Sequence, residues 1–479
     1  MLTTLAFRHL LVRKLRSLFL LLGFSLGVGV MIVLLSVGQA MLDQSRDVSL
    51  VGGGELTVLP QGIDIEAMRT GGVSGMFFGI DRARFLTRQL LGGPRQDHQV
   101  QAVSPLIEGK LLYLRHADRT VAVRAGGEIP SRAFAAGSAL SLQSGSWEDS
   151  RADSAYVVPS SQELYDELDR FHLPPRQDST WGEWHYFNLV TSPDEWWYIT
   201  YLVGGEIPAG KWGGQLLITH RRPDGRYERF TAEAPSSSVV FDTAGADVTI
   251  GGSSVQLRDG RYRLQGEAAG EGGRLRIDVM LVPAARRYFP PVELRGSDLL
   301  SGYVVPALSA RASGKVCRAG RCRSFTGVPA YHDHNWGIWR DVTWEWGTGQ
   351  GSRFNLLYGG VYGSENEGDR ERSPFFMALV DSLGVRQVLR FNSVHYAGSR
   401  AVAGETGAAG PTHFNLVAAH NADTVRVNVR VTDALATAMR ASTFRRFFLQ
   451  MRGRFHLSGR VAGQVVADSG MGHFETYTR

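Results

Sequence analysis

From about residue 176 onward, apolar and polar side chains alternate with a period of two. The segments 274–281 and 425–431 each carry valine, leucine or isoleucine at every second position. This pattern is typical of strands with one buried face. Asp259-Gly260 and Pro223-Asp224-Gly225 are strong turn signals between such segments. Many short strands joined by tight turns predict antiparallel barrels or sandwiches.

The β-rich region runs to roughly 300 residues, which is more than one small barrel needs. We therefore expect a mainly β fold with two consecutive antiparallel barrels, over residues 176–324 and 325–479. Two helices are expected beside them. One begins with a capping box at Ser160 and ends before Pro174-Pro175. The other would cover Ala434–Gln450 and pack on a barrel.

The N-terminus has a different pattern, an uncharged apolar run over residues 17–42. Four basic residues lie before it: Arg8, Arg13, Lys14 and Arg16. The length predicts a transmembrane helix, and the basic residues predict that segment 1–16 is cytoplasmic. The alternative is a secreted protein with a cleaved signal peptide, because Gly38-Gln39-Ala40 has the form of a cleavage site. Both hypotheses place the remaining chain outside the cytoplasm.

Between the helix and the barrels, residues 43–175 have a weak pattern. Short strands are expected at Val51–Pro60, Lys110–Leu114 and Val121–Arg124. We expect a small α/β or poorly ordered segment and linker here.

Composition limits the function classes. The 57 glycines and the 20% of charged residues fit β structure with many turns. The net charge of +6 would suit nucleic-acid binding, but the arginines are scattered and no basic helix or zinc knuckle accompanies them. We therefore expect no nucleic-acid partner. The sequence also has no Gly-x-Ser-x-Gly motif, which disfavours a serine hydrolase.

The only two cysteines, Cys317 and Cys322, flank Gly320. Their spacing suits a disulfide that closes a hairpin in an oxidising compartment. Metal binding would need further soft ligands nearby, and the neighbouring sequence has none.

The segment Tyr331–Trp346 is the densest in candidate chemistry, with four of the ten tryptophans. If it is a strand, Tyr331, Asp333 and Asn335 share one face, and His332, His334 and Trp336 share the other. In an apolar cavity Asp333 would stay protonated and donate a proton to a weak base such as an alkene. The alternative is a structural aspartate that accepts hydrogen bonds from backbone amides or Arg340. A metal site at His332 and His334 is a further alternative, although no third ligand is evident.

A second aromatic cluster lies upstream, over Trp181–Asn188 and Glu195–Tyr198. It is interpreted either as barrel core or as pocket lining. The two clusters, with Trp212, hold nine of the ten tryptophans, which favours two halves that face one cavity. Six residues are predicted to contact an apolar ligand: Trp336, His334, Asn335, Trp184, His185 and Trp197.

Five motifs, spread over residues 176–479, resemble the carotenoid 1,2-hydratase (hydroxyneurosporene synthase) and AttH-like family. They are Glu183–Asn188, Glu195–Tyr198, Gly302–Pro306, Tyr331–Gly337 and the closing Gly459…Gly463…Glu475-Thr-Tyr477. The resemblance implies two lipocalin-like barrels with an apolar ligand near their junction, and no metal or cofactor. It also implies that Asp333 is the proton donor to an isoprenoid double bond, with Tyr331 as its partner. The His-x-Trp pair of the hydratases has no counterpart between Ala284 and Arg323.

The first 110 residues or so are similar to the start of a macrolide-exporter or lipoprotein-release type ABC permease. The similarity lies in Leu5–Ser17, the apolar helix and Glu55–Pro60. The chain has no second apolar run of spanning length, so we do not expect a complete permease half. Two hypotheses follow. One is a membrane-anchored protein that binds an isoprenoid or lipid, as an accessory to an ABC transporter. The other is a hydratase or isomerase that uses Asp333.

Overall fold

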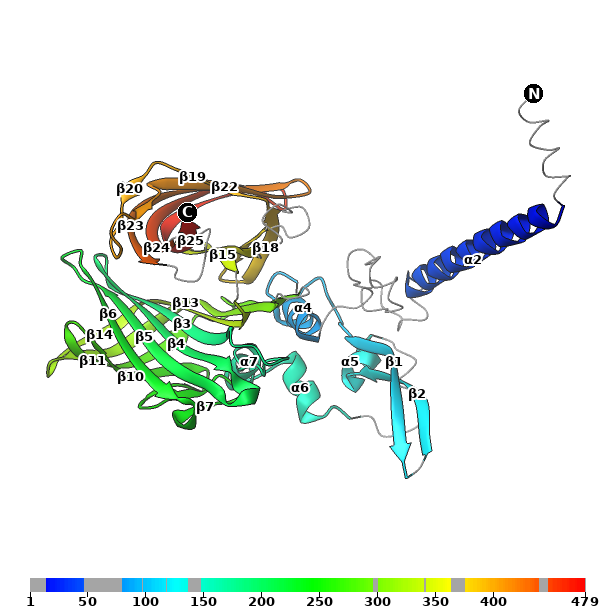
Figure 1. Cartoon of the computed structure of the whole chain (residues 1–479), viewed down its shortest axis with the longest axis horizontal. Coiled ribbons are helices and arrows are strands. Elements are labelled where there is room, and N and C mark those ends of the chain that lie inside the picture. Colours follow the sequence, from blue (N-terminus) through cyan, green and yellow to red (C-terminus); the bar gives the residue numbers. More distant parts are fainter. Residues whose placement is uncertain are drawn as a thin grey trace. The chain divides into compact units, whose positions relative to one another are not determined.

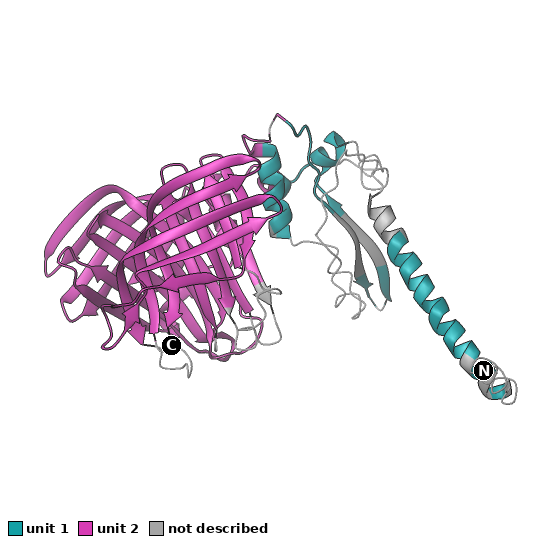
Figure 2. Ribbon diagram, turned by 90° about the horizontal axis from the view of Figure 1, so that it is seen from above, with its two compact units in different colours: residues 1–91, 99–153 teal, residues 92–98, 154–479 magenta. Residues whose placement is uncertain are grey.

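The computed structural model describes residues 14–46, 80–96, 98–117, 119–136, 148–295, 300–339, 342–362, 375–438 and 447–478. By its internal contacts the chain forms two compact units, residues 1–91 with 99–153 and residues 92–98 with 154–479 (Figure 2). Three sequence predictions lie outside the described residues: most of the basic segment 1–16, the strand Val51–Pro60 and the partner Arg340.

The first unit contains the apolar helix α2 (Lys14–Arg46). Its stretch Leu21–Gln39 is long and apolar enough to cross a membrane and is not buried, features that a signal sequence shares. The predicted short strands near residues 110 and 121 form an antiparallel hairpin of β1 (Leu106–His116) and β2 (Arg119–Glu128). Among the described residues, this unit also contains the helices α4 (Ile80–Gly92, of which Gly92 falls in the second unit) and α5 (Pro130–Ala135).

The second unit contains two closed barrels, each of eight antiparallel strands (Figure 1). This confirms the fold class predicted from the alternating pattern. In the first barrel, β14 pairs with β3, and the pairing of β10 with β11 completes the closure. Its strands are β3 (Trp181–Ser192), β4 (Glu195–Glu206), β5 (Lys211–Arg221), β6 (Tyr227–Pro235), β10 (Arg261–Gly270), β11 (Gly273–Pro283), β13 (Leu300–Arg318) and β14 (Arg321–Ile338). The shorter strands β7 (Val239–Phe241), β8 (Val248–Ile250), β9 (Ser253–Arg258) and β12 (Phe289–Arg295) extend this sheet.

The second barrel closes where β18 meets β22, at the pair Arg390 and Ala419. Its strands are β15 (Thr343–Gly351), β16 (Asn355–Tyr362), β17 (Phe375–Asp381), β18 (Gly384–Phe391), β22 (His413–His420), β23 (Asp423–Ala438), β24 (Phe447–Val461) and β25 (Gln464–Thr478). Three short strands lie between β18 and β22 in the sequence: β19 (Val394–Ala397), β20 (Arg400–Ala401) and β21 (Ala409–Gly410). An apolar core that includes Phe414, Phe455 and Phe474 fills its interior.

Two expectations differ from the structure. Strand β14 belongs to the first barrel, between β13 and β3, so the barrel boundary falls after Ile338 and later than the expected position 324. The prediction of a helix over Ala434–Gln450 is wrong for the described residues. These residues belong to β23 and β24, in which Ala434 pairs with Met451. The helical spacing of apolar residues there is overridden because, as strands, these segments bury Ala434, Ala436, Leu449 and Met451 in the core of the second barrel.

The helix before the first barrel begins as predicted. In α7 (Ser161–Leu168), Ser160 and Glu163 form the full capping box. Residues Tyr165 and Leu168 are buried, and the Tyr165 ring packs 6.0 Å from that of Tyr262. The chain then continues into the interior of the barrel, where Asp169 and Phe171 are fully buried.

Another apolar cluster lies between the two barrels. It joins Tyr303 and Leu308 of β13 to Leu357 and Val380 of the second barrel. Aromatic contacts cross the boundary, since the Tyr303 ring lies 5.1 Å from Trp346 and 5.6 Å from Phe376. The outer faces of the two barrel sheets thus pack against each other, as the layers of a β-sandwich do. A functional site can therefore lie between the two barrels.

Candidate functional site

The two faces of β14 point into different environments, as strand alternation predicts. Asp333 and Asn335 line a cavity between the barrels, opposite Glu475 of β25. His332 and His334 point into the interior of the first barrel and bind Asp169. The register explains this division: β14 pairs with β3 residue by residue from Ala330 to Ile338, so neighbouring side chains alternate between the two sides.

The junction cavity has a volume of about 430 Å³, within the usual range for small-molecule sites. Both barrels supply its walls, to which aromatic residues contribute many of the side chains. The rings that line it are Trp184, Tyr186, Tyr198, Phe230, Tyr303, Trp339, Trp344, Trp346 and Phe448. A cavity with walls of this kind suits an apolar ligand, and the faces of the rings can stabilise positive charge.

Asp333 is the first of two carboxyl groups in this cavity. Its side chain is only 2% exposed, and Asn335 Nδ2 donates a hydrogen bond of 2.6 Å to Oδ1. Burial and, to a lesser extent, the nearby Glu475 raise the pKa of Asp333, hydrogen bonds from Tyr331 and Asn335 oppose the shift, and the resulting pKa is about 8. Tyr331 in turn accepts a hydrogen bond of 3.2 Å from Trp346 Nε1. Asp333 is therefore mostly a neutral acid at pH 7.

Glu475 is the second carboxyl group and comes from the other barrel. Trp344 Nε1 donates to its Oε2 at 2.8 Å, and Gln450 Nε2 lies 3.4 Å from its Oε1. Burial raises the pKa of Glu475, and hydrogen bonds from Trp344, Gln450 and Tyr186 lessen the rise. The site therefore combines two acids whose charged forms are disfavoured, and it exists only where the two barrels meet.

A neutral base lies near the same wall. The Tyr198 hydroxyl is 3.2 Å from His473 Nδ1. Burial, together with the nearby Arg452, lowers the pKa of His473 to about 3, so its imidazole is uncharged at pH 7. Tyr198 lines the cavity, and this pair can therefore orient a polar group or water there.

The opposite face of β14 belongs to a buried cluster of carboxylates and histidines. Asp169 accepts from His332 Nε2 at 2.8 Å and from His334 Nδ1 at 2.9 Å. His334 Nε2 donates at 3.1 Å to Glu183. Burial lowers the pKa of His334, but these two carboxylates outweigh it and raise the pKa to about 9. His334 is therefore a buried cation held between two anions.

By residue type this cluster is similar to a metal site, because Asp169, His185 and His334 place their ligand atoms within 4.8 Å of one another. Within this triad His334 Nδ1 lies 2.9 Å from Asp169 Oδ1, the distance of a direct hydrogen bond, whereas His185 Nδ1 lies 3.5 Å from the same oxygen. The hydrogen bonds from His332 and His334 to Asp169 fasten the segment after α7 to β14.

The predicted ligand contacts are divided between these two environments. Trp184 and Asn335 line the junction cavity beside Asp333, and Tyr331 lies in the cluster between the barrels. His185, His334 and Trp336 lie inside the first barrel. There the Trp336 ring stacks 3.8 Å from His172 and donates to Glu293 at 3.0 Å. The division follows the period of two, because residues adjacent to a cavity position point the other way.

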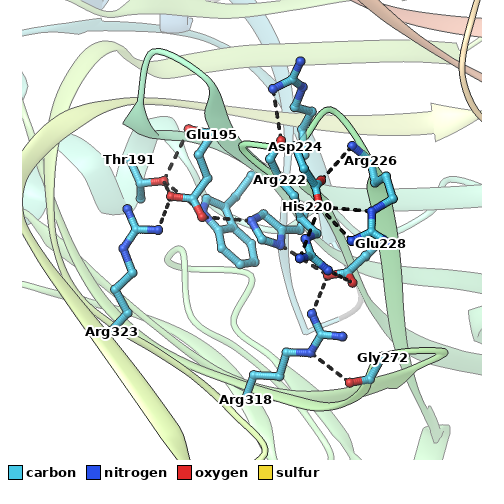
Figure 3. A network of polar contacts seen from close by, with 12 residues as sticks. Thr191, Glu195, His220, Arg222, Asp224, Arg226, Glu228, Gly272, Arg318 and Arg323 are labelled. Carbon is cyan, nitrogen blue, oxygen red and sulfur yellow. Dashed lines mark hydrogen bonds and ion pairs between the residues drawn. The ribbon is translucent and has the colours of Figure 1, made fainter.

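Trp197 also lies apart from the cavity. Its ring stacks 3.5 Å from that of His220. His220 belongs to a network of polar contacts (Figure 3). In this network Glu195 accepts from His220 at 3.1 Å and from Arg323, while Arg318 donates to Glu228 at 2.7 Å. Cys317 of β13 and Cys322 of β14 form a disulfide next to Arg318 and Arg323 in the chain. The network thus attaches the end of the β13–β14 hairpin to the edge of the first barrel.

The sequence did not single out the second-barrel residues of the site. Glu475 stands out in the sequence only as part of the closing motif Gly459…Gly463…Glu475-Thr-Tyr477, and Gln450 lies in the expected helix Ala434–Gln450. Within β25, Phe474 is fully buried in the second barrel, so Glu475 must point outward. That alternation is the signal that could have identified it, once the strand and its partner were known.

Comparison with known proteins gives similarity in structure only. No protein-family model matches the chain, and no curated protein matches it in sequence. Among solved structures, an AttH-like protein from Nitrosomonas europaea has 17% identity and a TM-score of 0.45, over 65% of this chain and 98% of that one. Kievitone hydratase from Nectria haematococca has 13% identity and a TM-score of 0.42, over 67% and 94%. CghA has 10% identity and a TM-score of 0.44, over 64% and 93%.

Proposed function

We propose that the junction cavity binds an apolar isoprenoid or lipid and that Asp333 donates a proton to a carbon–carbon double bond of this ligand. The observation that supports this most is a buried carboxyl group that faces an aromatic cavity, with a hydrogen-bond donor on one oxygen. Burial keeps such a group protonated at neutral pH, as general-acid catalysis requires.

Proton transfer from Asp333 to the alkene needs no cofactor. The O–H bond of Asp333 breaks, a new C–H bond forms at one alkene carbon, and the other carbon becomes cationic. The faces of Trp344, Trp346 and Tyr186 stabilise this cation. Either water adds to this cation and the resulting oxonium loses a proton, or a neighbouring C–H bond breaks and loses its proton. In both cases the proton returns to the carboxylate of Asp333. The outcome is hydration in the first case and isomerisation in the second.

Deuterium incorporation from D₂O into geranylgeraniol tests this proposal, with mass spectrometry as the readout. The Asp333→Asn variant is expected to bind the alcohol like the wild type, by tryptophan fluorescence, and to lose about a hundredfold or more in rate. Asp278→Asn is the matched control, because Asp278 forms a partly exposed pair with Arg263 away from the cavity. Equal rates in Asp333→Asn and wild type would exclude Asp333 as the donor.

A second candidate function is lipid binding without turnover, in a membrane-anchored extracytoplasmic accessory to an ABC transporter. The exposed apolar stretch Leu21–Gln39 favours it. If the wild type incorporates no deuterium and yet co-purifies with lipid, this candidate replaces the first. Sequencing of the mature N-terminus separates an anchor from a signal peptide, since a chain that begins at Met41 has lost the helix.

A further inference from the structure

Two histidines and an aspartate meet inside the first barrel. His185 of β3 and His334 of β14 are paired directly across the two strands, so their side chains lie on the same face of the sheet. Asp169 reaches them from the segment after α7, and the three ligand atoms lie within 4.8 Å of one another. All three residues are fully buried. Two imidazoles and a carboxylate form a ligand set typical of a divalent transition metal ion.

The ring of His185 has one nitrogen without a hydrogen bond. Its Nε2 lies 2.9 Å from the carbonyl oxygen of Ala246, and because this oxygen only accepts, Nε2 is the donor. Among the described residues, the buried Nδ1 has no hydrogen-bond partner, and it faces Asp169 Oδ1 at 3.5 Å. A nitrogen lone pair and a carboxylate oxygen, both hydrogen-bond acceptors, therefore face each other in the interior of the barrel. A cation between them would stabilise this pair.

Hydrogen bonds hold the other two ligands from behind. His334 Nε2 donates to Glu183 at 3.1 Å, so that its Nδ1 points towards Asp169 Oδ1. His332 Nε2 donates at 2.8 Å to the other oxygen of Asp169, Oδ2. Metal-binding histidines usually donate their second N–H to a carboxylate or a backbone carbonyl, and metal-binding carboxylates are hydrogen-bonded in turn. Each of the three ligands therefore already has the outer contact that a metal site requires.

The separations of the ligand atoms suit a small divalent ion. A tetrahedral zinc ion at about 2.1 Å from each ligand atom holds these atoms about 3.4 Å apart. His185 Nδ1 and Asp169 Oδ1 are 3.5 Å apart. His334 Nδ1 lies at 2.9 Å from the same oxygen because a hydrogen bond joins them. An ion in place of that hydrogen would move His334 outward by about half an ångström.

A neighbouring group offers a competing set of ligands. His172, Glu183 and His334 also place ligand atoms within 4.8 Å of one another. There Glu183 Oε1 already joins the two rings, at 2.9 Å from His172 Nδ1 and 3.1 Å from His334 Nε2. Among the described residues, the buried nitrogen without a partner belongs to His185 and not to this group. The observation therefore favours the deeper set with Asp169.

We propose that Asp169 Oδ1, His185 Nδ1 and His334 Nδ1 bind a divalent transition metal ion, of which zinc is the representative. The ion takes the place of the hydrogen between His334 and Asp169 and joins the segment after α7 to β3 and β14. Calcium and magnesium fit less well because they take oxygen ligands. The site lies on the inner face of β14 and does not depend on the proposed role of Asp333 on the outer face.

Zinc binding to the full chain in nanodiscs tests the proposal, with protein that carries no polyhistidine tag and has been stripped by a chelator. Wild type is expected to retain about one zinc ion per chain after desalting, by elemental analysis. Zinc should raise its Tm by about 5 °C or more. X-ray absorption at the zinc edge should show imidazole and oxygen neighbours. A wild type that retains no zinc, or zinc without imidazole neighbours, would overturn the proposal.

His185→Gln removes a ligand and keeps a donor. The glutamine amide can donate to the carbonyl of Ala246, as imidazole Nε2 does, but it presents no nitrogen lone pair to Asp169. We expect zinc affinity to fall by more than about a hundredfold, the upper range for loss of an outer partner. Thermal unfolding in the presence of chelator checks that the variant folds. Unchanged affinity would exclude His185 as a ligand and with it the proposed site.

His172→Gln is the matched control, because it removes an imidazole from the neighbouring group and leaves the three proposed ligands in place. Its zinc affinity is expected to equal that of the wild type. A loss as large as that expected for His185→Gln would place the ion in the neighbouring group and overturn the assignment. The wild-type stoichiometry and this control decide the question even if His185→Gln does not fold. Neither measurement depends on turnover at Asp333, so the two proposals can fail separately.

Discussion

Asp333 on the outer face of β14 and Asp169, which contacts the inner face of β14, are both buried. Their pKa values are nevertheless shifted in opposite directions. The two residues are 2% and 0% exposed, respectively. For both, burial is the largest influence and raises the pKa. At Asp169, the histidines 332, 185 and 334 reverse this effect and lower the pKa below its usual range. At Asp333 the pKa stays raised, to about 8, because its neighbours are aromatic rings, an amide and a second acid.

The partners of a buried acid therefore decide whether it is charged and what it does in the molecule. Asp169 keeps its charge and holds two histidines of β14 to the segment after α7. Asp333 keeps its proton and has one side open to a cavity. The same strand therefore carries a structural ion cluster on its inner face and a candidate acid on its outer face.

Removal of the charge at Asp169 should have the largest effect. Asp169→Asn leaves the buried cation of His334 with one carboxylate fewer, so the free energy of unfolding is expected to fall by about 3–5 kcal/mol. Urea unfolding at pH 7, followed by tryptophan fluorescence, measures this loss. Asp333→Asn should cost far less at pH 5, where the wild-type group is neutral. An equal loss in both variants would contradict the distinction between the two faces.

The proton on Asp333 should make stability depend on pH. The folded chain holds this proton up to about pH 8, whereas the unfolded chain releases it near pH 4. The folded state therefore binds more protons in this window, and stability falls as the pH rises through it, by about 1.4 kcal/mol per pH unit for one proton. Asp333→Asn is expected to lose this part of the slope in urea unfolding between pH 5 and 8. A slope identical to that of the wild type would show that Asp333 ionises normally.

Replacement of Glu475 should shift the pKa of Asp333. Glu475 raises the pKa of Asp333, so Glu475→Gln is expected to lower it, by about one unit or less. The alkaline limb of the pH–rate profile for deuterium incorporation should move to lower pH by the same amount. Infrared titration of the carboxyl band gives an independent reading, and a shift to higher pH would contradict the arrangement.

Asn335 should have the smallest effect, with the opposite sign. Its amide stabilises the carboxylate form of Asp333 through the bond of 2.6 Å. Asn335→Ala is therefore expected to raise the pKa of Asp333 by a few tenths of a unit, to about one at most. The same infrared titration measures it, and shifts of equal sign in the two variants would contradict the geometry.

The period-two pattern was enough to predict the β fold, the pair of barrels and the face shared by Tyr331, Asp333 and Asn335. It could not predict which strands close each barrel. For this reason the expected boundary at residue 324 places most of β14 in the second barrel. It also could not predict partners distant in sequence. Asp169 meets His334 from 165 positions away, and Glu475 reaches the cavity only because β25 packs against β15. Short-range alternation orients a side chain, whereas tertiary pairing decides what that side chain meets.

The pairing of β3 with β14 has a kinetic consequence. The hydrogen bond from His332 Nδ1 to the carbonyl of Tyr186 spans 146 positions. Contacts of such range form slowly, because the entropy of closing the loop is lost before the contact stabilises it. Until β14 pairs with β3, Asp333 has no apolar cavity to face and ionises like any exposed aspartate. The chain thus acquires its acid late, only after its first barrel has closed and packed against the second.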